Sequence, residues 1–203
     1  MNERPEPMND PDLPELIVRC LRGDQTAYAT LYERYAPGLY RLAYSVLLEE
    51  QDAEDVVQEA LVYAFRSLER YDPQRGAFRT WLYTITISRC RNARRRKWLP
   101  TVALSNLLNI GVEPSAPPDE SPEVRAAWRD LRASLERALK TLSPRLREAV
   151  ALRYGQGLTY REMAEIMDCP QKTAESRVRL AHEQLRSAMS AADRAALEEL
   201  WSV

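Results

Sequence analysis

The stretch from Thr159 to Arg179, TYREMAEIMDCPQKTAESRVR, decides the fold class of this 203-residue chain. Thr159 is followed three residues later by Glu162, which is the pattern of a capping box at the start of a helix. The DCP tripeptide at 168–170 predicts a tight turn, and apolar spacing after it predicts another helix over about 171–189. Two helices joined by about three residues form a helix-turn-helix.

The rest of the chain has the same helical periodicity, so we expect an all-α protein of two small helical domains. Further helices are predicted at about 13–22, 25–36, 38–48, 52–68, 77–97, 123–141 and 144–154. The break after residue 36 rests on Pro37, which has no backbone N–H to donate. Proline-rich sequence with acids and no bases then predicts domains at 12–98 and 125–192, joined by a linker at 99–124.

Composition excludes several classes of protein. Hydrophobic residues make up 45% and charged residues 29% of the chain, with only 6 glycines, which does not fit disordered or collagen-like proteins. No apolar stretch is long enough to span a bilayer, and the first residues lack a signal-peptide pattern, so we expect a cytoplasmic protein without membrane insertion. The three cysteines are an odd number, widely spaced and without a C-x-x-C pair, which fits neither a zinc site nor a disulfide framework, and we expect no cofactor or metal.

The net charge of −1 conceals two blocks of opposite charge. Residues 49–59 include six acids and no base, whereas residues 89–97 include six bases and no acid. Each block has an ordinary structural explanation, as a solvated helix end that complements the helix dipole. Together they indicate two different partners.

The second helix of a helix-turn-helix enters the major groove of DNA and reads base edges with its early residues. The alternative is a plain surface helix of a bundle, but the capping box, the short turn and the neighbouring bases favour DNA binding. The candidate contacts are Gln171, Lys172, Thr173, Glu175, Ser176, Arg177 and Arg179.

The basic block at 89–97 lies close in sequence to several aromatic residues, Tyr71, Phe78, Trp81 and Tyr83. Aromatic stacking surfaces beside phosphate-binding bases suit unpaired nucleotides. This part of the chain is therefore a second candidate nucleic-acid surface.

These motifs together resemble the bacterial sigma factors of the extracytoplasmic-function (ECF) group. DAEDVVQEA at 52–60 resembles region 2.2 of that family, and FRTWLY at 78–83, followed by the basic helix, resembles regions 2.3 and 2.4. GLTYREMA at 157–164 and TAESRV at 173–178 resemble region 4. The motifs occur in the family's order over most of the chain, with a short acidic linker in place of the region 3 domain.

The resemblance implies the partners of each surface. The acidic helix would dock on core RNA polymerase, at the clamp helices of the β′ subunit, with further contact to the β subunit; its residues are Asp52, Asp55, Gln58 and Glu59. The loop at 71–78 would hold a base flipped from the −10 promoter element. The −10 contacts would be Tyr71, Arg75, Phe78, Arg79, Trp81, Ser88, Arg91 and Arg95. The helix-turn-helix would read the −35 element, and an anti-sigma factor is expected as a further partner.

Two other classes of function remain as alternatives. A stand-alone helix-turn-helix regulator would need a dimer interface, which is not evident in the sequence. A metal-dependent nuclease would need acids that converge on a metal, whereas the acids at 49–59 share one helix, so we do not expect an enzyme. The arginines near Cys90 could lower its thiol pKa and permit a redox role, although a buried, inert thiol is the simpler interpretation.

Overall fold

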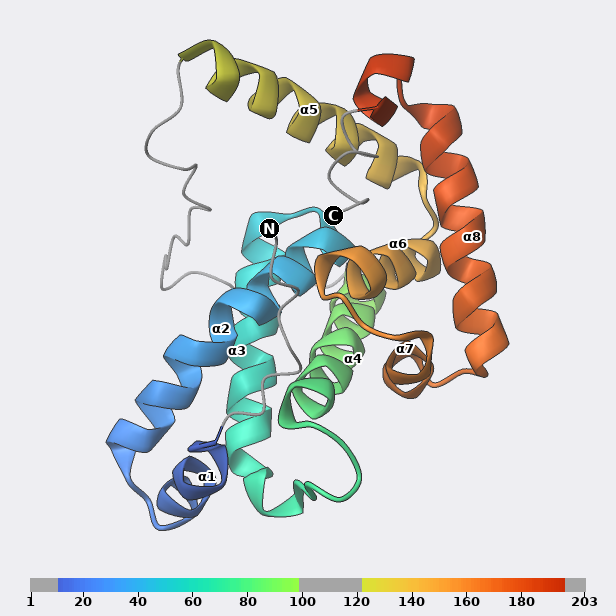
Figure 1. The fold of residues 1–203 in the computed structure, drawn as a ribbon. Helices are drawn as coiled ribbons and strands as arrows, with labels where there is room; N and C mark the ends of the chain where they lie inside the picture. The colour runs from blue at the N-terminus through green and yellow to red at the C-terminus, as the bar shows by residue number, and fades with distance from the viewer. Residues whose placement is uncertain (1–10, 99–121, 196–203) are drawn as a thin grey trace.

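A computed structural model describes residues 11–98 and 122–195, and within these ranges all regular structure is helical (Figure 1). The all-α prediction is therefore confirmed. The helices are α1 (Leu13–Leu21), α2 (Gln25–Leu47), α3 (Glu50–Arg66), the 3₁₀ turn η1 (Leu68–Arg70), α4 (Phe78–Trp98), α5 (Pro122–Thr141), α6 (Pro144–Val150), the π-helical turn η2 (Ala151–Gly155), α7 (Tyr160–Met167) and α8 (Gln171–Ala188).

Helices α1 to α4 form the N-terminal domain, and each contributes an apolar stripe to a common core. Helix α2 begins where the carboxylate of Asp24 accepts hydrogen bonds from the amides of Thr26, at 2.9 Å, and Ala27, at 3.4 Å. These bonds satisfy amides that have no partner within the helix. The start of α2 is thus set by a local contact that the sequence already contains.

The predicted break at Pro37 is wrong, because α2 continues through that residue to Leu47. A proline inside a helix removes one backbone hydrogen bond. The buried stripe of α2 includes Tyr35 before the proline and Leu39 and Leu42 after it. Burial of these side chains on one continuous face offsets the lost hydrogen bond, so tertiary packing overrides the local signal.

The helix-turn-helix is confirmed in the C-terminal domain. The Thr159 amide donates to Glu162 Oε2 at 2.8 Å, and the Glu162 amide donates to Thr159 Oγ1 at 3.3 Å, which completes the capping box of α7. Asp168 ends α7 in the left-handed conformation, with φ 52°, and α8 begins three residues later. Met163 and Val178 are buried where α7 and α8 pack together.

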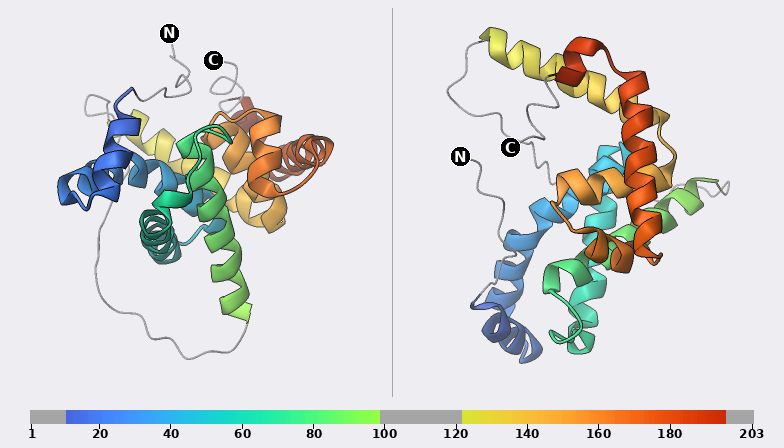
Figure 2. Two further views of the ribbon diagram at one scale, coloured as in Figure 1. Left: turned by 90° about the horizontal axis from the view of Figure 1, so that it is seen from below. Right: turned by 45° about the vertical axis from the view of Figure 1, so that its right-hand side comes forward.

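The two domains are in contact along α4, which lies between α2 and α3 on one side and α7 on another (Figures 1 and 2). One apolar cluster runs from the N-terminal domain into the C-terminal domain, and it includes Leu82 and Cys90 of α4 with Leu152 and Met163. A smaller cluster joins α5, α6 and α8. The predicted linker lies mostly outside the described residues, which resume at 122, where α5 begins.

Candidate nucleic-acid and polymerase interfaces

Aromatic side chains support the loop between η1 and α4. The ring of Phe78 lies 5.0 Å from that of Tyr71 and 5.5 Å from that of Trp81, with Tyr35 of α2 behind it at 5.2 Å. The Tyr71 hydroxyl donates to the carbonyl of Gly76 at 3.2 Å and so closes the loop. Tyr71 and Trp81 are partly exposed, but Phe78 is only 2% exposed. The structure thus places Phe78 in the core beneath the loop, whereas Tyr71 and Trp81 reach the surface.

The remaining candidates for −10 contacts differ in their exposure. Arg75 in the loop and Ser88 and Arg95 on α4 are exposed, and the guanidinium of Arg79 lies 5.9 Å from the centre of the Tyr83 ring. Arg91 is half-buried and turns toward the C-terminal domain, where it forms an ion pair with a glutamate of α6. The structure therefore leaves Arg75, Ser88 and Arg95 accessible and engages Arg91 elsewhere.

Part of the basic block at 89–97 forms a cluster between α3 and α4, and the sequence did not predict the contribution of α3 to it. The Arg89 guanidinium stacks on the Tyr63 ring at 4.7 Å, within the range of a cation–π interaction. A cavity of about 320 Å³ lies beside it, lined by Glu59, Arg89, Asn92, Arg95 and Arg96. Arg96 is held by Glu59 at 2.9 Å, so one acid partly neutralises this cluster.

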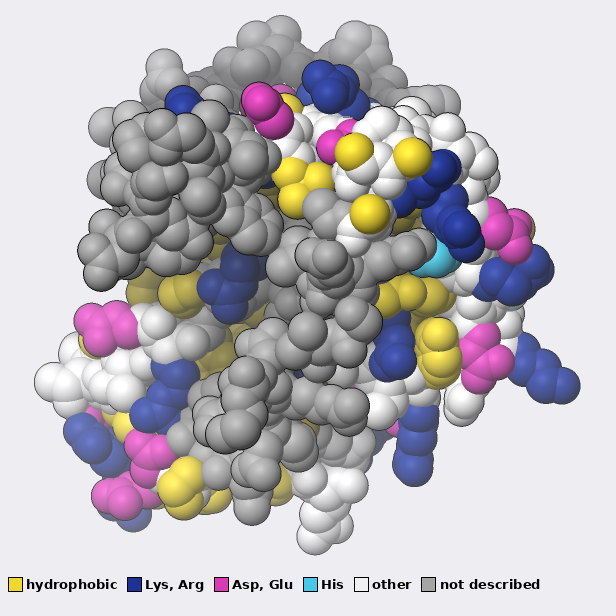
Figure 3. Space-filling model, turned by 45° about the horizontal axis from the view of Figure 1, so that its top comes forward, with side chains coloured by type: hydrophobic (Ala, Val, Ile, Leu, Met, Phe, Trp, Pro, Cys, Tyr) yellow, Lys and Arg dark blue, Asp and Glu magenta, His cyan; other side chains and the backbone are white. Residues whose placement is uncertain are grey.

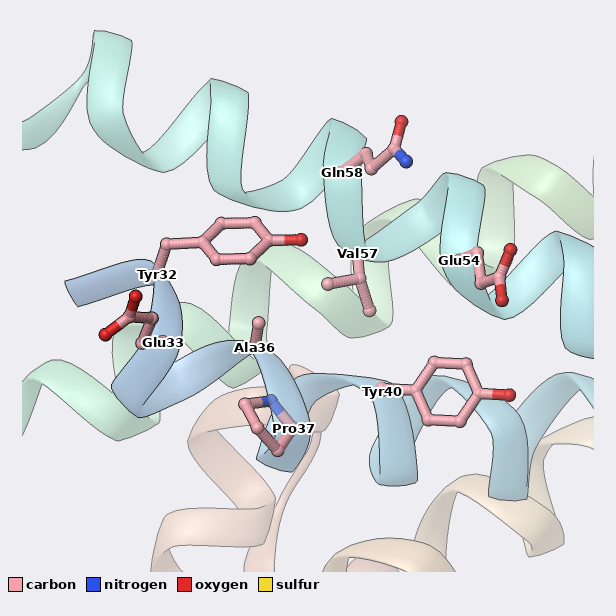
Figure 4. A pocket seen from close by; sticks show the side chains of 8 residues that line it. All are labelled: Tyr32, Glu33, Ala36, Pro37, Tyr40, Glu54, Val57 and Gln58. Carbon is pink, nitrogen blue, oxygen red and sulfur yellow. The ribbon is translucent and has the colours of Figure 1, made fainter. Parts of the chain in front are cut away.

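The acidic helix α3 presents its charges beside an apolar groove that it forms with α2. Figure 4 shows Val57 and Ala36 facing each other in the groove, with the rings of Tyr32 and Tyr40 on either side. The cavity measures about 110 Å³ and is also lined by Glu33, Pro37, Glu54 and Gln58. Burial, together with the charges of Glu50 and Glu54, raises the pKa of Tyr40. The groove is therefore apolar at its base and negatively charged at its edge.

The predicted polymerase-binding residues are distributed over this acidic side of α3. Asp55 is exposed, and Asp52, Gln58 and Glu59 are partly exposed. Only Gln58 of the four lines the apolar groove, whereas Glu59 lies on the α4 side in its ion pair with Arg96. The residues thus share one helix but do not converge on a single pocket.

Polar side chains cover the outer face of α8, where Lys and Arg gather at the right-hand edge of the molecule (Figure 3). Gln171 donates to Glu175 at 2.9 Å and Arg179 to Glu183 at 2.9 Å, so two candidate contacts are already oriented along the helix. Gln171, Lys172 and Arg179 are exposed, and Thr173, Glu175, Ser176 and Arg177 are partly exposed. Nη1 of Arg177 lies 3.6 Å from Cys169 Sγ, in the turn before α8, so this arginine is partly covered.

Cys90 does not have the environment that its arginine neighbours suggested. Its side chain is fully buried, and burial together with the charge of Glu148 raises the thiol pKa to about 12. Arg94 and Arg91 act in the opposite direction but are outweighed. A thiol with a raised pKa is protonated and unreactive at neutral pH, so the proposed basis for a redox role is wrong.

Comparison with known proteins agrees with this arrangement. Residues 31–99 match the family model for Sigma-70 region 2, and residues 132–185 match that for Sigma-70 region 4. The chain is 34% identical over 180 residues to the RNA polymerase sigma-H factor of Pseudomonas aeruginosa, covering 86% of this chain and 92% of that protein. It is 35% identical over 174 residues to the ECF RNA polymerase sigma-E factor of Escherichia coli, covering 84% of this chain and 90% of that protein. The chain belongs to the ECF sigma factors. The family resemblance read from the sequence is confirmed.

Solved structures support the fold of this ECF sigma factor. CnrH, solved in complex with the cytosolic domain of CnrY, matches with a TM-score of 0.58 at 24% identity, covering 85% of this chain and 93% of that chain. The sigma factor RpoE of Bartonella quintana, solved with the anti-sigma factor NepR, also gives a TM-score of 0.58, at 22% identity. The match covers 79% of this chain and 95% of that chain. Among the described residues, no helix is long and apolar enough to cross a membrane.

Proposed function

We propose that this sigma factor directs core RNA polymerase to promoters through two separate DNA-binding elements and catalyses no reaction itself. The observation that carries the proposal is the pair of surfaces described above, the loop with α4 in region 2 and α8 in region 4. Residues 71–78 with α4 contact the −10 element, and the early residues of α8 read the −35 element. The protein acts in the cytoplasm, where polymerase and promoter DNA are present.

Melting of the −10 element takes place at the aromatic loop. Tyr71 and Trp81 offer partly exposed rings for an unstacked base, and Arg75 and Arg95 offer exposed cations for the adjacent phosphates. Base stacking on an aromatic side chain is worth about 1–3 kcal/mol, which offsets part of the cost of unpairing a base. Phe78 contributes by holding the two rings in place from the core.

Core polymerase docks on the acidic side of α3. A surface that has acids around an apolar groove is complemented by a partner helix with basic and apolar side chains, and we assign the β′ clamp helices to this place. The β subunit contacts the chain elsewhere. An anti-sigma factor is a further partner, and the sigma factor RpoE has been solved in complex with one, NepR.

The deciding experiment is run-off transcription with purified core polymerase on a library of promoter fragments, with and without this protein. New transcripts with a shared sequence upstream of their start sites are expected. No new transcript, combined with a polymerase-independent footprint on a palindrome, would instead identify a stand-alone regulator.

Polymerase docking is tested by charge reversal at Asp55, which is exposed on α3. Asp55→Lys should weaken binding to core polymerase about tenfold or more, because like charges then face each other across the interface. Glu69→Lys, which reverses an exposed acid on η1, is the matched control. The double change of Asp55 with Glu59 should weaken binding further, but it also breaks the Glu59–Arg96 pair, so the single change is the cleaner test.

A further inference from the structure

A buried glutamate connects the two domains. Glu148 of α6 is 0% exposed, and its carboxylate accepts from Arg91 of α4, at 2.8 Å from Nη2 and at 3.2 Å from Nε. Nη1 of Arg94, also on α4, lies 3.5 Å from Glu148 Oε1, and Nη1 of Arg145 lies 3.6 Å from Oε2. The guanidinium group of Arg91 therefore binds a carboxylate that lies 57 residues away in the sequence.

Two further hydrogen bonds cross the same boundary. Nη2 of Arg91 also donates to the carbonyl of Met167, at 3.2 Å, at the last residue of α7. The hydroxyl of Tyr83, which is buried on α4, donates to Gln156 Oε1 at 2.5 Å. Together with Glu148, these bonds hold one side of α4 against the C-terminal domain.

The cluster around Glu148 contains more positive than negative charge. Arg94 Nη1 and Arg147 Nε are buried nitrogen atoms without a hydrogen-bond partner. Burial, and then the nearby charge of Arg94, lower the pKa of Arg147. A single carboxylate thus pairs with three guanidinium groups, with a fourth, that of Arg147, on the neighbouring residue, so the cluster has the charge to bind a further anion such as a DNA phosphate.

We propose that Glu148 binds the arginines of α4 where DNA phosphate would otherwise bind them. It thereby holds the free protein in an arrangement that cannot bind the −10 element. We call the contacts of Glu148 with Arg91 and Arg94 the clasp. The donors that Arg91 gives to Glu148 and Met167 are the same ones that a bidentate phosphate contact requires, so the two states exclude each other. Binding to core polymerase separates the domains and releases the arginines. This inference rests on the proposed role of α4 in DNA binding.

The clasp can be tested in the full-length protein through Cys90. This thiol is fully buried on α4, in the apolar cluster that includes Leu152 and Met163 of the C-terminal domain, so separation of the domains should expose it. Glu148→Gln keeps the size of the side chain and removes its charge. We expect alkylation of Cys90 by N-ethylmaleimide, followed by peptide mass spectrometry, to become about tenfold faster or more in this variant. Cys20, which is buried on the inner face of α1 in the N-terminal domain, should stay as slow as in the unchanged protein.

Two other variants complete the design. Glu165→Gln removes an acid whose exposed ion pair with Arg161 stays within α7, and it should leave the labelling of Cys90 unchanged. Tyr83→Phe breaks the buried bond to Gln156 and should accelerate labelling without altering any charge. If circular dichroism shows that Glu148→Gln does not fold, the result for Tyr83→Phe decides the question.

The functional readout is binding to a fluorescent DNA duplex with a single-stranded tail at low salt. If the open, DNA-binding conformation makes up about 1–10% of the free protein, the apparent affinity for DNA is reduced to that fraction of its intrinsic value. Release of the clasp should therefore tighten DNA binding about 10- to 100-fold. Unchanged labelling of Cys90, or faster labelling without tighter DNA binding, would overturn the proposal. If the unchanged protein fails to start transcription with core polymerase, the proposed function fails, whereas the labelling result still reports on the clasp.

Discussion

Replacement of Phe78 by leucine tests whether this residue supports the promoter-melting loop or touches DNA. The Phe78 ring contacts three other rings, those of Tyr35, Tyr71 and Trp81, at centroid distances of 5.0–5.5 Å. Each aromatic contact is worth about 0.5–1.5 kcal/mol beyond the buried area, so their loss should cost roughly 1.5–4.5 kcal/mol. For a chain of this size, that corresponds to a decrease in the melting temperature of about 3–18 °C.

The assay combines thermal unfolding, followed by circular dichroism, with permanganate footprinting of promoter opening by the holoenzyme. Tyr28→Leu is the matched control, because the Tyr28 ring contacts one other ring in the described part of the chain, that of Phe65 at 5.1 Å, and its loss should cost about a third as much. We expect Phe78→Leu to lower both stability and opening. A variant that keeps its melting temperature but loses promoter opening would refute the reasoning, since it would assign Phe78 a direct contact with DNA.

Three other changes have expected outcomes. Arg177→Ala should reduce transcription from a −35-dependent promoter about tenfold, because a good base contact contributes about 1–3 kcal/mol. Arg186→Ala, at the far end of α8, is the control. Equal activity of the two variants would exclude a base contact by Arg177. Thr159→Ala should lower the free energy of unfolding by about 0.5–2 kcal/mol in a urea titration, because it removes the cap of α7. Hydrogen bonds from Thr26 and then Arg19 lower the pKa of Asp24, so its contribution is present above about pH 4, the pKa of an unfolded aspartate, and is lost as the pH falls below it. Asp24→Asn should therefore flatten the acid limb of the stability curve, and an unchanged acid limb would contradict this assignment.

Local signals in the sequence were sufficient for most of the fold. The capping box at Thr159 and Glu162 involves residues three apart, and the turn that follows is defined by neighbouring residues, so the helix-turn-helix could be predicted without knowledge of the core. The same approach was wrong at Pro37, where the penalty is local but the compensation comes from side chains packed by other helices.

The candidate site was predicted less completely, because exposure and pairing depend on contacts between distant segments. Phe78 belongs to an aromatic motif, but the sequence does not show that Tyr35 covers one side of it. Cys90 has arginine neighbours in sequence, yet its environment is dominated by burial and by Glu148. Glu148 itself lies on a short helix with buried neighbours, and no spacing rule connects it to α4.

The mixed character of the surface between α4 and the C-terminal domain also has a consequence for temperature. This surface joins apolar side chains, such as Leu152 and Met163, to the ion pair of Glu148. Apolar association weakens on cooling, and the cost of removing charged groups from water falls on warming. Both effects favour the joined domains in warm solution and separation in the cold. Small-angle scattering of the free protein should therefore show a larger radius of gyration near 5 °C than near 35 °C.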